Sequence, residues 1–407
     1  MKLGFICLDL PGHVNPMSAL ARRLQARNHE VVFLYSSGAA GLPFVPCPEK
    51  DHINENRQEA SRKQGEEALK FSLRAVLAQT EAILKSLPAV VQENGIDALM
   101  IDTVQFYAEL GAMQLSIPYV HIANGVHWDY SGYTPLCLYG WPYETTQAAL
   151  ARNREGVAKW ANLLNSLNGG IKEHAKSAGL KIDWNDLSST VSPFASITQV
   201  PRVFDFESSH WPSQFHHTGP FHNGRGRTKV DFPWERLTGE PLIYASMGTI
   251  LNGQVHVFRA IVAALAKNKN LQLVLSVGDQ IDPEQIEPVP NNAIIVKRAP
   301  QLELLKHATV CITHAGLNTV LESLAQGVPQ IAIPITYDQP GVAARIADKK
   351  TGVVTSLDKL TAHHLVFLLN EVLTDATYRE NSRKLQRGIA EADGLSAAAD
   401  LVEESLG

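Results

Sequence analysis

Two residues in the N-terminal part of the chain, His13 and Asp102, could act together in proton transfer. Each stands at or just after the end of an apolar run, at residues 2–10 and 97–102, so both are expected at the carboxyl ends of buried strands. A histidine with a pKa of about 6.5 can take a proton from an alcohol, and a carboxylate beside it can fix its tautomer and stabilise its charged form. His13 could instead serve only local hydrogen bonds, and Asp102 could cap the following helix.

A glycine-containing turn at residues 314–319 could hold an anion. It joins a β-branched run at residues 309–313 to a helical pattern. Gly316 lets the backbone approach a ligand closely, and the helix after it offers free N–H groups and the positive end of its dipole. These features predict a phosphate-binding turn with His314 as a donor beside it, although His314 could also be a structural cap.

Three polar residues near the same turn could contact a ligand. Asp338 and Gln339 close the strand predicted at residues 330–334, and polar side chains at the carboxyl ends of parallel strands line the crevice of an open α/β sheet. Glu322 lies just inside the predicted helix, where a carboxylate could accept hydrogen bonds from ribose hydroxyls or simply be solvated. Asp338 and Gln339 could equally be ordinary loop residues.

Two glycine turns follow strands in this half of the chain. Residues 246–249, Ser-Met-Gly-Thr, come after a strand at residues 242–245 and resemble a second phosphate loop or an ordinary glycine turn. Gly278 follows the strand predicted at residues 273–277 and is a candidate contact of the same kind. No Asp-x-Asp pair and no His/Cys cluster with metal-ligand spacing is present, which argues against a metal holding the phosphates.

The elements that must position these residues form two sets of alternating strands and helices. In the first set, Asn15 and Pro16 are expected as the cap and the first residue of a helix. The GxGxxG fingerprint of dinucleotide-binding proteins is absent from this set, which argues against a dinucleotide-dependent oxidoreductase. The N-terminal set has strands at residues 2–10, 29–35, 97–102 and 118–123, and the C-terminal set has strands at residues 242–245, 272–277 and 292–296 with a helix at 255–267. The pattern predicts an α/β fold of two Rossmann-like domains.

Composition supports two soluble domains. The chain has 407 residues, 45% of them hydrophobic, and a net charge of −5 without a Lys/Arg run, which argues against nucleic acid as a partner. No apolar stretch is long enough to span a membrane. The four cysteines lack metal or redox spacing, so we expect a cytoplasmic protein with buried, reduced thiols at Cys7 and Cys311.

Changes in composition predict the domain boundaries. The segment around residues 204–233 is rich in Gly, Pro and His and lacks periodicity, which is typical of a connection between domains. We expect a first domain at residues 1–215, a linker at 216–236, a second domain at 237–385 and a C-terminal segment at 386–407.

The spacing of the motifs resembles the family 1 glycosyltransferases, UDP-sugar-dependent enzymes with the two-domain GT-B fold. The elements that carry the resemblance occur in the family's order: Gly12-His13-Val14-Asn15-Pro16, Pro300-Gln301, His314-x-Gly316-x-Asn318-Thr319, Glu322, Gly327-Val328-Pro329 and Asp338-Gln339. The wording is similar to the bacterial branch that includes zeaxanthin and macrolide glycosyltransferases. Arg298 stands where many relatives have a tryptophan that stacks on uracil, which leaves the choice between UDP and dTDP open.

The resemblance implies that residues 1–215 bind the acceptor, that residues 237–385 bind the nucleotide sugar, and that residues 386–407 form a helix that packs back on the first domain. It also implies a role for each matched residue. His13 would be the general base and Asp102 its orienting acid, and His314 would contact the diphosphate. The donor site would comprise Ser246, Gly248, Thr249, Gly278, Arg298, Ala299, Gln301, His314, Gly316, Asn318, Thr319, Glu322, Asp338 and Gln339. An aromatic, irregular stretch at residues 127–143 suits the wall of an apolar acceptor cleft, with Trp128, Tyr130, Tyr133 and Trp141 as candidates.

We therefore expect an inverting glycosyltransferase that moves a sugar, glucose by family habit, from a UDP-sugar co-substrate to a hydroxyl of an apolar or aromatic small molecule, with no cofactor and no metal. Two alternatives stay open. A nucleotide-sugar epimerase of the same architecture would convert the donor with no acceptor present. A non-catalytic sugar-nucleotide-binding subunit would bind UDP without turnover.

Overall fold

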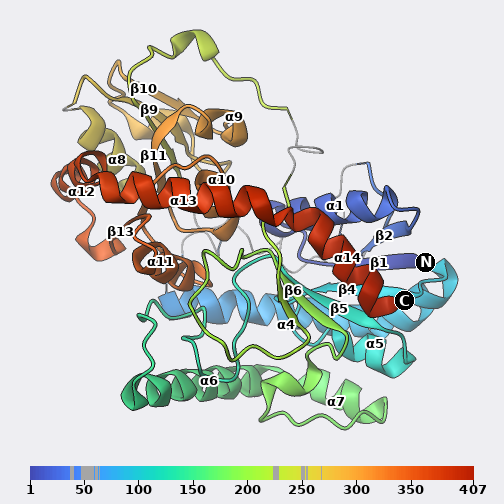
Figure 1. Cartoon of the computed structure of the whole chain (residues 1–407). Helices are drawn as coiled ribbons and strands as arrows, with labels where there is room; N and C mark the ends of the chain where they lie inside the picture. Colours follow the sequence, from blue (N-terminus) through green and yellow to red (C-terminus); the bar gives the residue numbers. More distant parts are fainter. Residues whose placement is uncertain are drawn as a thin grey trace.

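Two parallel β-sheets organise the chain, one in each half (Figure 1). The computed structural model describes residues 1–36, 41–46, 59, 63, 65–222, 229–248, 253, 255–266 and 268–407. The first sheet has the order β3-β2-β1-β4-β5-β6-β7 and the second the order β10-β9-β8-β11-β12-β13. In each sheet the order reverses beside the first strand, which is where ligands bind in open α/β sheets.

The strands are short and mostly buried. In the first sheet they are β1 (Lys2–Ile6), β2 (Glu30–Leu34), β3 (Phe44–Val45), β4 (Ala98–Asp102), β5 (Tyr119–Ala123), β6 (Ala195–Thr198) and β7 (Phe215–His217). In the second they are β8 (Leu242–Ser246), β9 (Gln272–Ser276), β10 (Ala293–Val296), β11 (Ala308–Thr313), β12 (Gln330–Ala332) and β13 (Gly352–Val354). Every predicted strand overlaps an observed one, and β3, β6, β7 and β13 lie outside the predicted set.

Helices cover both faces of each sheet. The N-terminal half has α1 (Pro11–Gln25), α4 (Gly65–Asn94), α5 (Glu109–Leu115), α6 (Gln147–Leu167) and α7 (Gly169–Ser177). The C-terminal half has α8 (Val255–Ala266), α9 (Gln301–Leu305), α10 (Leu317–Ala325), α11 (Gln339–Asp348), α12 (Ala362–Thr374) and α13 (Ala376–Ala392), and α14 (Gly394–Leu406) ends the chain. Short 3₁₀ turns are η1 (Leu187–Thr190), η2 (Trp234–Arg236), η3 (Pro283–Ile286) and η4 (Leu357–Lys359).

The start of α1 differs from the sequence prediction. The helix begins at Pro11, not at Pro16, so His13 lies in its first turn and Pro16 lies inside it. A proline at the first position fits because that N–H has no intrahelical partner, whereas Pro16 removes the N–H that would bond to the carbonyl of Gly12. The carbonyl of Gly12 therefore remains available for a partner outside the helix.

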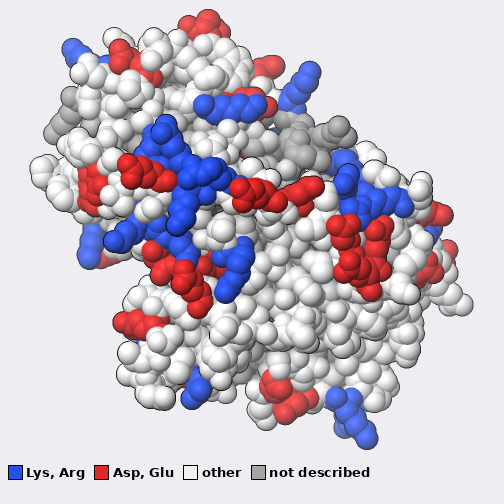
Figure 2. Space-filling view, viewed as in Figure 1, with Lys and Arg blue, Asp and Glu red and all other residues white. Residues whose placement is uncertain are grey.

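The last helix returns to the first domain. In Figure 1, α13 crosses from the C-terminal half and α14 lies along α1. Arg27, just after the end of α1, pairs with Asp400 and Glu403 of α14 at 2.5 and 2.7 Å, and Figure 2 shows basic and acidic side chains together at this contact. The first sheet also extends further than predicted, because His216 and His217, which we placed in the linker, belong to β7.

Two further findings concern the described residues. None of their helices is long and apolar enough to cross a membrane. The thiols of Cys7, Cys137 and Cys311 are free and buried, and burial raises the pKa of each. Cys47 lies outside the described residues.

Candidate active site

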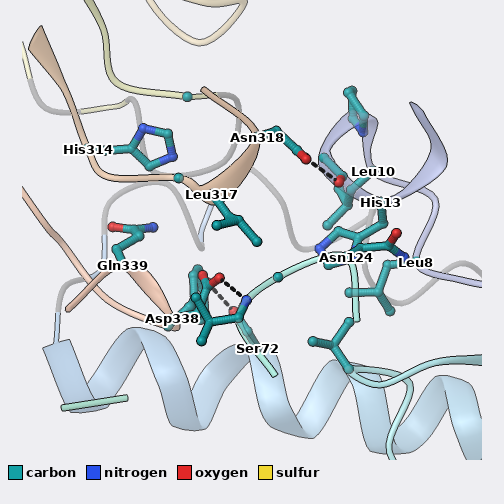
Figure 3. A pocket seen from close by; sticks show the side chains of 18 of the residues that line it. Leu8, Leu10, His13, Ser72, Asn124, His314, Leu317, Asn318, Asp338 and Gln339 are labelled. Atoms are coloured by element: carbon teal, nitrogen blue, oxygen red, sulfur yellow. Dashed lines mark hydrogen bonds between the residues drawn. The ribbon is translucent and has the colours of Figure 1, made fainter. Parts of the chain in front are cut away.

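A cavity of about 360 Å³ lies between the two domains, where the carboxyl ends of both sheets meet. A volume of this size suits a small-molecule ligand. Most of the predicted site residues line it: His13, Trp128, Ser246, Gly248, Gln301, His314, Gly316, Asn318, Thr319, Glu322, Asp338 and Gln339. Figure 3 shows His13 and His314 on opposite sides of this cavity.

His13 and Asp102 form a hydrogen-bonded pair at the wall of the cavity. The distance from His13 Nδ1 to Asp102 Oδ2 is 2.6 Å. Asp102 ends β4 and is fully buried, whereas the His13 side chain is 19% exposed. An ionised carboxylate can only accept, so Nδ1 carries the proton and the Nε2 lone pair is left to accept another.

The surroundings of His13 change its basicity. Burial by itself would lower the pKa of His13, but the neighbouring carboxylate of Asp102 and, more weakly, that of Asp338 outweigh burial, so the pKa lies above its ordinary value. Asp102 stabilises the charged form of the ring because it is close and accepts its N–H. The pair therefore has the geometry of a general base held by an acid.

His314 lies in a cradle formed by two glycines. A Cβ at Gly316 would stand 2.5 Å from His314 Nε2, and a Cβ at Gly248 would stand 2.6 Å from the same atom. Gly248 also has a φ of +77°, which side chains rarely adopt. The His314 ring therefore packs directly against the backbone of Gly316 and Gly248, where any side chain would collide with it.

His314 is neutral near pH 7. Burial lowers its pKa to about 4, against a smaller opposing effect from the backbone of Ser246. Its Nδ1 is buried and has no hydrogen-bond partner within the described protein. A phosphate oxygen could satisfy this atom, provided that the atom carries a proton.

The turn before α10 places backbone donors beside His314. Ala315 has a left-handed φ of 65°, which redirects the chain from β11 into the helix, and Gly316 is the N-cap residue. The first-turn N–H groups of a helix lack intrahelical partners and carry the positive end of its dipole. The arrangement matches the predicted anion-binding turn.

A chain of hydrogen bonds positions Glu322. Tyr244 donates to the carbonyl of the Gln301 side chain at 2.9 Å, and the amide of Gln301 donates to Glu322 Oε2 at 2.6 Å. Glu322 is only 2% exposed. The carboxylate is therefore held in one orientation at the cavity wall.

Asn318 has a different neighbourhood from the one that we predicted. Its side-chain amide donates to the carbonyl of Gly12 at 2.7 Å, the group that Pro16 leaves free in α1, and its side-chain oxygen accepts from Gln199 at 2.9 Å. Both partners belong to the N-terminal half. The Asn318 side chain thus ties the turn that carries His13 to the turn that carries His314, as Figure 3 shows.

Asp338 and Gln339 use part of their hydrogen-bonding capacity within the protein. Asp338 Oδ2 accepts from the Val126 N–H at 2.9 Å, an approach that a side chain at Gly125 would block. Burial raises the pKa of Asp338, and that hydrogen bond opposes the rise. The Gln339 side-chain oxygen accepts the N–H groups of Ile335 and Thr336, which leaves its amide toward the cavity.

Three of the described residues that we predicted for the donor site do not line the cavity. Arg298 is exposed and forms a two-pronged pair with Asp279, at 3.0 and 2.6 Å. Gly278 and Ala299 do not line the cavity either, and Thr249 lies outside the described residues. We predicted Gly278 from its position at a strand end, which does not determine how far a loop extends, and Arg298 and Ala299 from the family resemblance.

Only one of the four predicted acceptor aromatics, Trp128, lines this cavity. Tyr130 lines a second, smaller cavity, Tyr133 stacks on His210 at 3.7 Å between ring centroids, and Trp141 stacks on Tyr139 at 4.0 Å. The stretch is irregular, so no periodicity indicated which rings face inward. The other aromatic residues of the cavity wall include Phe71, Phe106 and Trp160, which lie outside this stretch of the sequence.

Sequence reasoning also missed Asn124. It follows β5 at the same sheet edge as Asp102, lines the cavity and is 2% exposed, and both polar atoms of its amide lack a hydrogen-bond partner in the described protein. A polar residue directly after a buried strand was the signal that could have identified it. Among the described residues, no group of three His, Cys, Asp or Glu could hold a metal ion.

Comparisons with known proteins find glycosyltransferases that are similar to this chain. A family model described as UDP-glucoronosyl and UDP-glucosyl transferase matches residues 235–389. A zeaxanthin glucosyltransferase of Pantoea ananas is 27% identical and covers 97% of this chain and 93% of its own. A demethyllactenocin mycarosyltransferase of Streptomyces fradiae is 26% identical over 99% of this chain and 86% of its own.

A solved structure gives the same result for the fold. The glycosyltransferase of kitacinnamycin superposes with a TM-score of 0.78 at 24% identity and covers 100% of this chain and 99% of its own. The predicted GT-B arrangement of two Rossmann-like domains across a cleft is confirmed.

Proposed function

The chain belongs to family 1 of the UDP-glycosyltransferases and is a glycosyltransferase with a nucleotide-sugar donor, and from this premise we propose that it is an inverting enzyme. It would transfer glucose from UDP-glucose to a hydroxyl of an apolar or aromatic small molecule. The observation that carries the proposal is the His13–Asp102 pair facing the His314 turn across one cavity.

His13 would act as the general base. Its Nε2 would take the proton of the acceptor hydroxyl while the acceptor oxygen forms a bond to the anomeric carbon. The bond from that carbon to the β-phosphate oxygen breaks, and its electron pair leaves with UDP. Attack from the side opposite the leaving diphosphate inverts the configuration at that carbon. Asp102 would stabilise the imidazolium that forms.

The C-terminal half would receive the leaving group. Charge that develops on the diphosphate would meet the first-turn N–H groups of α10 and the His314 ring. The carboxylate of Glu322, fixed by Gln301, is suited to accept hydrogen bonds from the ribose. Asp338 and the free amide of Gln339 are suited to the sugar hydroxyls.

The other half of the cavity supports an apolar acceptor. Its wall near His13 is formed by the side chains of Leu8, Leu10, Val76, Phe106, Trp128 and Trp160. These residues offer aromatic and aliphatic surface around one basic nitrogen. The choice of glucose and of an apolar acceptor is further supported by similarity to a zeaxanthin glucosyltransferase.

Replacing His13 tests the proposal directly. We expect His13→Ala to lower kcat by about 100-fold to 10,000-fold and to leave UDP affinity nearly unchanged, because the phosphate groups contact the opposite wall. Transfer would be followed by mass shift with UDP-glucose against a panel of phenols, terpenoids and polyketides, and UDP affinity by calorimetry. Wild-type transfer rates in the variant would refute the base assignment, and epimer formation from donor alone would refute the transferase reaction.

A further inference from the structure

A second cavity, of about 240 Å³, lies within the N-terminal half. Phe106 and Trp128 line both cavities, so their two rings, which meet edge to face at 5.3 Å between centroids, form part of the partition. None of the donor-site residues lines the second cavity. It is therefore separate from the site described above.

Glu109 lines this second cavity, and its charge lacks a close partner. The Glu109 side chain is 7% exposed. Among the described residues its ion-pair neighbour is His121, whose Nε2 lies 3.8 Å from Glu109 Oε2. That distance is too long for a hydrogen bond. His121 Nδ1 accepts from the Ser192 N–H at 3.2 Å, so its proton is on Nε2 and the ring can offer Glu109 only a distant N–H.

The other acid of the cavity is already satisfied. Asp129 accepts hydrogen bonds from the N–H and hydroxyl groups of Ser131 and Thr134, including two at 2.9 Å and one at 2.8 Å. No lysine or arginine is found among the described residues that line the cavity. A buried carboxylate without a cation or full hydrogen bonding is costly, so Glu109 is the group that favours a positively charged ligand.

Aromatic rings surround the same space. Trp128 and Tyr130 stack at 6.4 Å between centroids, and Trp211 and Phe215 stack at 4.7 Å, and all four line the cavity. The faces of such rings attract cations. The indole N–H of Trp211 is buried without a hydrogen-bond partner in the described protein, so the ligand should also carry an acceptor.

We propose that this second cavity binds a small organic ammonium ion that also carries a hydrogen-bond acceptor, with Glu109 as its counter-ion and Trp211 as a donor. Such a group has two possible sources. It could be an amine of the sugar acceptor itself, reaching past Trp128 from the first cavity, or it could be a separate small amine that binds independently of the acceptor.

Phenylethanolamine and its uncharged analogue styrene glycol provide a matched pair of probes. We expect the wild-type enzyme to bind the amine about tenfold or more tightly than the glycol, because only the amine pairs with Glu109. Calorimetry gives both affinities, and the emission of Trp128 and Trp211 reports occupancy. Failure of both probes to bind, or equal affinity for the two, would overturn the proposal.

Two variants and a control locate the binding. Glu109→Gln keeps the side-chain shape and should reduce the preference for the amine to about threefold or less, and Trp211→Phe, which keeps the ring face, should weaken both probes through the lost N–H. Glu173→Gln, on the exposed surface of α7, should change neither. An unchanged preference in Glu109→Gln would also overturn the proposal, and the Trp211→Phe result remains informative if Glu109→Gln does not fold.

Steady-state kinetics distinguish the two sources of the amine. Phenylethanolamine that competes with the sugar acceptor, and so raises only its apparent KM, would identify the cavity as an extension of the acceptor site. Binding of the amine without competition would identify an independent amine site. Binding itself is measured without turnover, so its failure is distinguishable from failure of the proposed transfer reaction.

Discussion

At the scale of single residues, the site contains two buried histidines whose pKa values are shifted in opposite directions. Both rings are buried enough to favour the neutral form, but only His13 has a carboxylate at 2.6 Å, so its pKa rises while that of His314 falls to about 4. One ring is thereby suited to accept a proton at neutral pH, and the other is neutral until an anion arrives.

The pH dependence of transfer should report the His13–Asp102 pair. Protonated His13 cannot act as a base, so kcat/KM should fall as the pH drops through a pKa above the usual value of about 6.5. Asp102→Asn removes the main cause of the raised pKa and should move this limb to lower pH, with a plateau rate lower by about 100-fold or more. Asp9→Asn, which removes a carboxylate that contacts Ser36, is the control. A limb that stays in place in Asp102→Asn would contradict the assignment.

UDP binding should be coupled to proton uptake at His314. A bound diphosphate should raise the pKa of His314 above the value of about 4 that it has in the protein without ligand. The contribution of His314 to UDP affinity should therefore grow as the pH falls from 8 toward about 5. His314→Gln should weaken UDP binding by about tenfold at pH 6 and should reduce the proton uptake measured by calorimetry in buffers of different ionisation enthalpy. Protons taken up by UDP itself contribute equally in the wild type and in His314→Gln. Equal proton uptake by the wild type and the variant would therefore contradict the prediction.

At the scale of elements, the His314 ring is placed by its packing against two glycine turns, one before α10 and one after β8. Neither turn has room for a side chain beside the ring. In the turn before α10, Ala315 also has a left-handed φ of 65°. A strained backbone of this kind is typical of a loop whose conformation is fixed for binding.

Gly316→Ala should damage donor binding without unfolding the domain. The new Cβ would meet the ring of His314 at 2.5 Å, so the ring must move away from its place beside the α10 N-terminus. Overpacking of this kind costs about 1–3 kcal/mol, which corresponds to UDP binding weakened by about 5-fold to 150-fold. Gly169→Ala, at a glycine with no neighbour within 4 Å of the added atom, should leave UDP affinity unchanged. Calorimetry with UDP compares the two, and equal affinities would show that the ring position is unimportant.

The sequence was most informative where an element has a strong local signal. The β11 run, the turn at residues 314–319 and α10 were predicted closely because β-branched residues, Gly316 and an apolar helix face all act within a few positions. The predicted start of α1 was wrong because a proline at either position 11 or position 16 could begin a helix, and the local sequence does not distinguish the two. Most aromatic residues of the cavity wall were missed because α4 and α6 contribute rings whose direction depends on packing between elements.

At the scale of the whole molecule, a buried ion pair joins the two halves. Arg345 of α11 is 1% exposed and its Nε lies 2.8 Å from Oδ1 of Asp205, which is fully buried and also contacts His217 Nε2 at 2.7 Å. Burial by itself would raise the pKa of Asp205, but Arg345, His127 and His217 together outweigh burial, and the pKa lies far below its usual range. A carboxylate with a lowered pKa stabilises the fold at pH values above its unfolded pKa, and this contribution is lost as the pH falls through the folded value.

This pair should contribute to stability in a way that a surface pair of the same chemistry does not. Arg345→Met leaves the Asp205 carboxylate buried without its cation, which should lower the free energy of unfolding by about 3–5 kcal/mol. Arg298→Met removes a two-pronged pair with Asp279 whose side chains are 63% and 44% exposed, and it should cost about 1 kcal/mol or less.

Urea unfolding of Arg345→Met and Arg298→Met compares the two losses in the free energy of unfolding. The double variant Asp205→Asn/Arg345→Met should lose less of this free energy than the sum of its two single changes, because neither charge is then left without a partner. Equal losses for Arg345→Met and Arg298→Met would show that burial adds nothing to the interdomain pair. The domains would then be held mainly by the apolar contacts around Phe204 and Leu317, which pack in one cluster between the two sheets.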